Sequence, residues 1–178
     1  MKKLLFLLLV IISLNKVDAQ KVYTTKTGQI FFNATGAAVK IEAINNQVDT
    51  KFVESTGQII FGALIKGFKF ENQLMEDHFN ENYMESTTYP KSDFKGYITN
   101  IKSVNFSKNG DYPISVEGTL TIHGVSNKVT TNGTMTILEG TPTIKGEFKI
   151  AIKDYGIKGS YIGDKIASAA TIKLNCKY

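Results

Sequence analysis

The sequence holds one cysteine and only two histidines among its 178 residues. Because a single cysteine cannot form an intramolecular disulfide, stability must come from packing and from hydrogen-bonded secondary structure. Cys176 lies in an alternating apolar segment near the C-terminus. That position favours a small buried side chain, although a disulfide between two chains stays open. His78 and His123 are far apart and match no zinc-binding spacing, so we expect no metal and no cofactor.

Catalytic motifs are lacking as well. The sequence has no Gly-x-Ser-x-Gly elbow, no phosphate-binding loop and no pair of acids at strand spacing. His78 follows Glu76 and Asp77, but neighbouring helix positions point in different directions, so we interpret His78 as a helix residue. His123 precedes Gly124 and is interpreted as a residue that shapes a turn. We therefore expect no catalytic residue and no enzymatic activity, with a lipid-directed enzyme as the weakest alternative.

Clustered charge is scarce too. The formal net charge is only +5, and the lysines of residues 20–178 are scattered singly. A nucleic-acid site would need a basic stripe with interleaved aromatic residues. We therefore expect no nucleic-acid partner.

No apolar run is long enough to span a membrane, which takes roughly 20 residues. The run Leu4–Leu14 follows Lys2 and Lys3 and precedes the small-residue stretch at residues 17–19. This order predicts a secretory signal over residues 1–19 that is cleaved after Ala19. We expect an exported protein, periplasmic or secreted, with no stable membrane span.

Residues 20–178 have the length of one domain, and neither a repeat nor a linker divides them. Apolar and polar residues alternate along most of this stretch, which is typical of strands with one buried face. The clearest apolar face is Tyr112, Ile114, Val116, Leu120 and Ile122. Further strands are expected at about 23–25, 29–34, 48–54, 58–65, 94–103, 129–137, 144–152 and 166–176, with turns at 56–57, 109–111, 124–127, 140–142 and 163–164.

Helical periodicity is confined to about residues 72–84, where Leu74, Met75, Phe79 and Tyr83 fall near one side. The chain is therefore expected to be all-β with one short helix. A sheet of about eight antiparallel strands leaves two open edges unless it closes into a barrel. A barrel of that size holds one small ligand or is filled by its own side chains.

Three segments carry a resemblance. Residues 118–130 read Gly-Thr-Leu-Thr-Ile-His-Gly-Val-Ser-Asn-Lys-Val-Thr, a strand, a turn and the next strand. Residues 75–83, followed by 89–94, and residues 148–157 agree in order and spacing. In the residues of these segments, and along the whole mature chain, the protein resembles the YceI-like family. The family often has an arginine shortly before the Asp-Tyr-Gly-Ile stretch, where this chain has Ile152 and Lys153, so the headgroup chemistry is not carried over.

The resemblance implies an extended lipocalin-like barrel with a hydrophobic channel that binds a polyisoprenoid or related long-chain lipid. The expected partner is an isoprenoid or other long apolar ligand, with a homodimer as a further possibility. The alternative is a side-chain-filled barrel with a structural or stress-related interaction role. The side chains expected to line the channel are Phe52, Phe61, Met75, Phe79, Tyr83, Phe94, Ile98, Val116, Leu120, Met135, Phe148 and Ile150.

Overall fold

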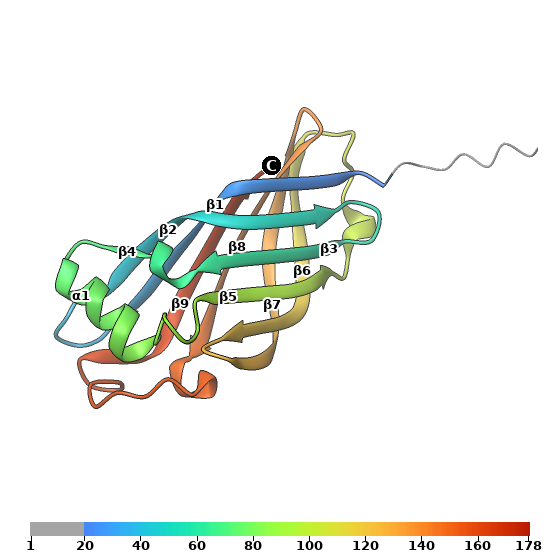
Figure 1. The fold of residues 1–178 in the computed structure, drawn as a ribbon. Coiled ribbons are helices and arrows are strands. Elements are labelled where there is room, and N and C mark those ends of the chain that lie inside the picture. The colour runs from blue at the N-terminus through green and yellow to red at the C-terminus, as the bar shows by residue number, and fades with distance from the viewer. Residues whose placement is uncertain (1–19) are drawn as a thin grey trace, which may run out of the picture.

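The computed structural model describes residues 20–178, in which alternating apolar and polar residues form long antiparallel strands (Figure 1). Eight of them follow one another around a wall, and β1 pairs with both β9 and β2, so the sheet closes on itself. This confirms the predicted barrel of about eight strands with one short helix. The expected signal at residues 1–19 lies outside the described residues. The long strands are β1 (Val22–Thr35), β2 (Glu42–Val53), β3 (Gln58–Leu64), β5 (Lys91–Ile98), β6 (Gly110–Ile122), β7 (Val125–Leu138), β8 (Thr141–Ala151) and β9 (Ile166–Lys177).

Two tight hairpins join β6 to β7 and β7 to β8. Their central residues are His123-Gly124 and Glu139-Gly140, and all four have positive φ, as a type I′ turn requires. Both turns lie slightly earlier than the sequence suggested, because the strands continue to the turn itself. Pro142, expected in a turn, is buried in β8.

The two strands expected at residues 23–25 and 29–34 are one strand, β1, with irregular register around Gly28. A Cβ at Gly28 would lie 2.9 Å from Cys176 Sγ and 3.0 Å from the Val48 carbonyl oxygen. The absence of a side chain therefore lets β1 pass close to its neighbours β2 and β9.

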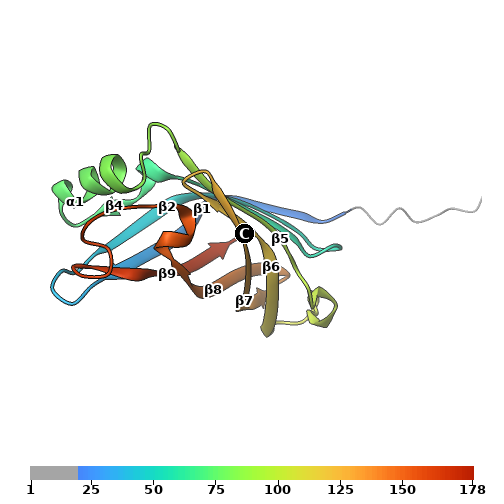
Figure 2. The ribbon, with the colours of Figure 1, turned by 90° about the horizontal axis from the view of Figure 1, so that it is seen from below.

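The predicted helix is present as α1 (Gln73–His78), followed by a π-helical turn over Phe79–Tyr83. Asn72 caps it, since its Oδ1 accepts hydrogen bonds from the backbone of Leu74 and Met75. The carboxylate of Glu76 is buried and accepts from Lys69 Nζ at 2.5 Å and from the Phe70 backbone at 3.3 Å. These contacts tie α1 to the short strand β4 (Lys69–Phe70), which pairs with β2, and so hold the helix at one end of the barrel (Figures 1 and 2).

Three single 3-10 turns complete the elements: η1 (Ile65–Gly67) between β3 and β4, η3 (Ile101–Ser103) after β5, and η4 (Ile152–Tyr155) after β8. The end of the barrel away from α1 is filled by side chains. Phe52 is fully buried there, with its ring centroid 5.7 Å from that of Tyr23 and 6.0 Å from that of Phe106. Tyr178 completes this group of four rings, which we call the aromatic plug.

Candidate binding cavity

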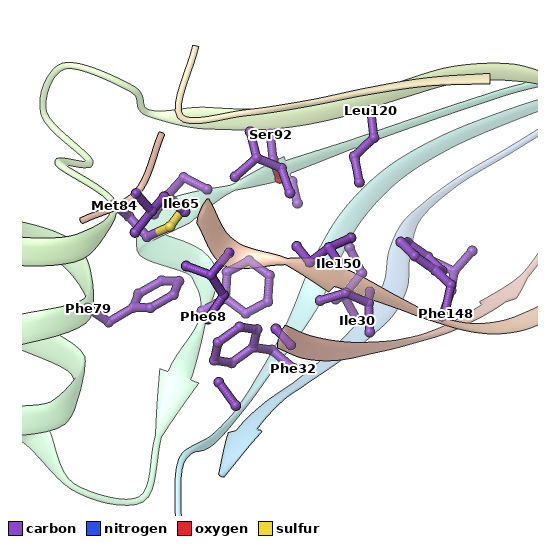
Figure 3. Close-up of a pocket in the computed structure, with 18 of the residues that line it drawn as sticks. Ile30, Phe32, Ile65, Phe68, Phe79, Met84, Ser92, Leu120, Phe148 and Ile150 are labelled. Carbon is purple, nitrogen blue, oxygen red and sulfur yellow. The ribbon is translucent and has the colours of Figure 1, made fainter. Parts of the chain in front are cut away.

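The half of the barrel next to α1 encloses a cavity of about 450 Å³ (Figure 3). That volume is in the range of about 300–1,000 Å³ found for small-molecule sites. The wall is almost entirely apolar and combines strand residues with residues of the α1 segment. Those labelled in Figure 3 are Ile30, Phe32, Ile65, Phe68, Phe79, Met84, Leu120, Phe148 and Ile150, with the hydroxyl of Ser92 among them.

The hollow arises from the size of the inward side chains. On β8 the inward positions are Ile144, Gly146, Phe148 and Ile150, all on the cavity wall. A Cβ added at Gly146 would have no atom within 4 Å, so the missing side chain leaves space in the middle of this row. Glycine weakens the interior of a strand, so Gly146 lowers the stability of β8 but leaves room for the cavity.

The floor of the cavity is the boundary with the filled half. Ile59, Ile114 and Ile144 are almost fully buried, line the cavity and also pack in the core cluster that contains Phe52. Below them the aromatic plug closes the barrel. The cavity is therefore blind at this end, and a long molecule would have to extend toward α1.

The mouth lies between three segments that gather at one end of the barrel (Figures 1 and 2): α1, the loop between β1 and β2, and the loop between η4 and β9. Each segment contributes apolar lining residues, among them Leu74, Val39 and Tyr161. Lys165 Nζ stands 4.7 Å from the centre of the Tyr161 ring. The mouth thus has an apolar rim with a cation beside it.

Besides the mouth, the wall of the barrel is interrupted along one side, between β7 and β8. The β7–β8 ladder ends at the pair Gly133 and Gly146, and beyond it β7 keeps only β6 as a partner while β8 keeps only β9. Across the gap, Thr131 Oγ1 donates to the Glu147 carbonyl at 3.4 Å and Asn127 Nδ2 to the Asp154 carbonyl of η4 at 2.8 Å. These two side-chain contacts therefore bridge part of the gap that the ladder leaves between β7 and β8.

Few polar groups face the cavity. Burial, with a smaller contribution from neighbouring Tyr161, raises the pKa of the Tyr83 hydroxyl, so this group stays a neutral donor at ordinary pH. His78 lies at the exposed mouth. His123 is outside the wall: its ring centroid lies 4.3 Å from that of Tyr89, and its Nε2 is 3.7 Å from Glu85 Oε1. Within residues 20–178 no three His, Cys, Asp or Glu side chains are grouped to hold a metal ion.

The structure places nine of the side chains expected to line the channel on the cavity wall: Phe61, Met75, Phe79, Tyr83, Phe94, Val116, Leu120, Phe148 and Ile150. Phe52, Ile98 and Met135 lie instead in the filled half, where each is almost completely buried among core residues. They point to the same interior, but at the level of the aromatic plug. Period-two alternation specifies the face of a strand and not the depth along the barrel axis, which is why the sequence did not separate them.

Several wall residues were not anticipated. Ile30, Phe32 and Ala34 alternate along β1 and had the strand signal to be found. Ile65 and Phe68 lie in or beside the 3-10 turn η1, where no periodic pattern marks the inward side. Their position depends on how that turn packs under α1.

The comparisons with known proteins agree with this geometry. A model of the YceI-like domain matches residues 15–178. The chain belongs to the YceI-like family. No curated protein matches the chain. Among residues 20–178 there is no helix with the length and hydropathy needed to cross a bilayer.

Solved structures share the YceI-like fold. A polyisoprenoid binding domain from Saccharophagus degradans, implicated in plant cell wall breakdown, superposes with a TM-score of 0.75 at 12% identity, covering 88% of this chain and 97% of that one. BcnA from Burkholderia cenocepacia has a TM-score of 0.68 at 19% identity, covering 83% and 94%. At such low identities the likeness shows the barrel fold alone.

Proposed function

We propose that this YceI-like protein is an exported, non-enzymatic carrier that holds the tail of a polyisoprenoid or related long-chain lipid in its half-barrel cavity. The observation that carries the proposal is the blind apolar cavity of about 450 Å³, open at the α1 end. The nine wall residues anticipated from the sequence are proposed to contact the tail. The description of the Saccharophagus degradans domain as polyisoprenoid binding supports the same ligand class.

Burial of the tail is sufficient for useful affinity. Each buried CH₂ contributes about 0.8 kcal/mol, so ten carbons contribute about 8 kcal/mol and twenty about 16 kcal/mol. Association and ordering cost about 4–15 kcal/mol. If that cost is about 4–8 kcal/mol, a twenty-carbon tail retains about 8–12 kcal/mol, which corresponds to dissociation constants in the micromolar to nanomolar range without a strong polar contact. All 21 basic residues are lysines, so the chain has no guanidinium to bind a phosphate in bidentate fashion.

Export is part of the proposal. The expected signal at residues 1–19, with cleavage after Ala19, places the carrier in the periplasm or outside the cell, where an insoluble tail needs a protein to cross water. Self-association of the chain stays a prediction, to be measured by sedimentation.

The test is native mass spectrometry of the mature protein, combined with solvent extraction and lipid analysis. We expect a stoichiometric apolar adduct, or uptake of one added polyprenol or long-chain quinone per chain. A protein that repeatedly arrives without adduct and takes up neither lipid would contradict the carrier. That outcome would favour the alternative of a structural or stress-related interaction protein.

A further inference from the structure

The rim of the cavity exposes apolar surface to solvent. Leu74 lines the cavity and is nevertheless 61% exposed, and Tyr161 on the facing loop is 49% exposed. Val39, on the β1–β2 loop, is a third partly exposed wall residue. Since these residues belong to both the wall and the outer surface, apolar surface continues without a break from the cavity onto the outside.

The rim carries charges of both signs, with Lys165 as the cation beside its apolar residues. The charged or titratable residues of the cavity wall include Lys165, His78 and Asp93. Of the two α1 carboxylates, Glu76 is paired with Lys69, whereas the exposed Asp77 accepts a hydrogen bond from the uncharged amide of Gln73 at 2.8 Å and keeps its negative charge. Lys165 above the Tyr161 ring is an arrangement that allows the aromatic group to lie at the depth of lipid headgroups while the ammonium stays in water.

We propose that the mouth docks on the surface of a phospholipid bilayer, with Leu74, Val39 and Tyr161 at the headgroup–acyl boundary and Lys165 beside the phosphates. The proposal rests in part on the proposed function, because a carrier of an insoluble tail has to take it from a membrane. In this orientation the cavity opens directly into the lipid, so the tail moves along a continuous apolar path.

The experiment uses tryptophan as the probe, since the chain contains none. Leu138 is the matched control: it is also 61% exposed but lies at the β7–β8 hairpin, whose Gly140 carbonyl accepts a hydrogen bond from Tyr23 of the aromatic plug at the opposite end. Leu74→Trp and Leu138→Trp are mixed with phosphatidylglycerol–phosphatidylethanolamine vesicles that contain brominated lipids. We expect quenching and a blue shift for Leu74→Trp alone.

Cosedimentation with the same vesicles gives the second readout. Leu74→Asp should weaken vesicle binding by about tenfold, because a half-buried leucine at the interface is lost, whereas Leu138→Asp should leave it unchanged. Equal quenching of both tryptophans, or equal effects of both aspartates, would overturn the docking surface.

Docking is separated from lipid uptake by repeating the measurements with Gly146→Phe, which fills the cavity and leaves the rim intact. If the blocked protein still binds vesicles through residue 74, docking holds even where carriage fails. A blue shift of Leu74→Trp that depends on protein concentration without vesicles would identify a second copy of the chain as the occupant and overturn the membrane proposal.

Discussion

Filling the cavity from Gly146 is the most direct perturbation that the barrel offers. A Cβ at this position has no atom within 4 Å, and the neighbouring inward residues on β8 all line the cavity. Gly62 on β3 provides the matched control, because its Cβ would also meet nothing within 4 Å but its lining neighbours Phe61 and Ala63 put it on the outer face. Gly146→Phe and Gly62→Phe therefore make the same chemical change inside and outside the barrel.

The expected loss of lipid affinity follows from the length of tail that the new side chain displaces. A phenylalanine ring in the cavity takes the place of about one isoprene unit, or five carbons, and at about 0.8 kcal/mol per carbon the loss is about 4 kcal/mol. That is roughly a thousandfold in the dissociation constant. Gly146→Leu should give a smaller loss and Gly146→Ala a still smaller one. None of the substitutions at positions 146 and 62 should unfold the protein, because aromatic and aliphatic residues suit strands better than glycine does.

The assay is the dissociation constant for one polyprenol or long-chain quinone, with thermal unfolding of each variant as the check on folding. We expect a graded loss from Ala to Leu to Phe at position 146 and no loss for Gly62→Phe. If Gly146→Phe folds normally and binds the lipid as tightly as Gly62→Phe does, the tail does not lie beside β8 and the cavity is not the site.

Two further predictions concern the filled half. Burial raises the pKa of the Cys176 thiol to about 12, partly offset by a hydrogen bond with the Gln29 backbone. The thiol ionises in the unfolded chain near pH 9, so its stabilising contribution is complete below pH 9 and is lost as the pH rises to 12. The free energy of unfolding from urea titrations should fall by about 1.4 kcal/mol per pH unit more steeply in the native protein than in Cys176→Ala between pH 9 and 11; equal slopes would contradict the burial. Phe52→Ala should cost about 3–5 kcal/mol of stability and leave lipid affinity nearly unchanged. Phe148→Ala should instead weaken lipid binding and change stability little, because Phe148 lines the cavity. Parallel effects of the two substitutions would show that the two halves are not separate.

The barrel could be predicted from the sequence because its signals are local. Alternation along residues 112–122 already places Ile114, Val116 and Leu120 on one face, and these residues do line the cavity. Three further features could be predicted without long-range information: the glycines at the turns, the helix near residue 75, and a number of strands large enough to close the sheet. A single cysteine likewise excluded an intramolecular disulfide from the outset.

Which half of the barrel is hollow was decided only by the tertiary structure. Phe52 and Phe148 both point inward, but one packs in the aromatic plug and the other lines the cavity. The difference arises because Tyr23, Phe106 and Tyr178, far apart in the chain, meet Phe52 at one level of the barrel. Alternation along a strand fixes the face of each residue, whereas strand register and tilt fix its depth, and these depend on all the strands together.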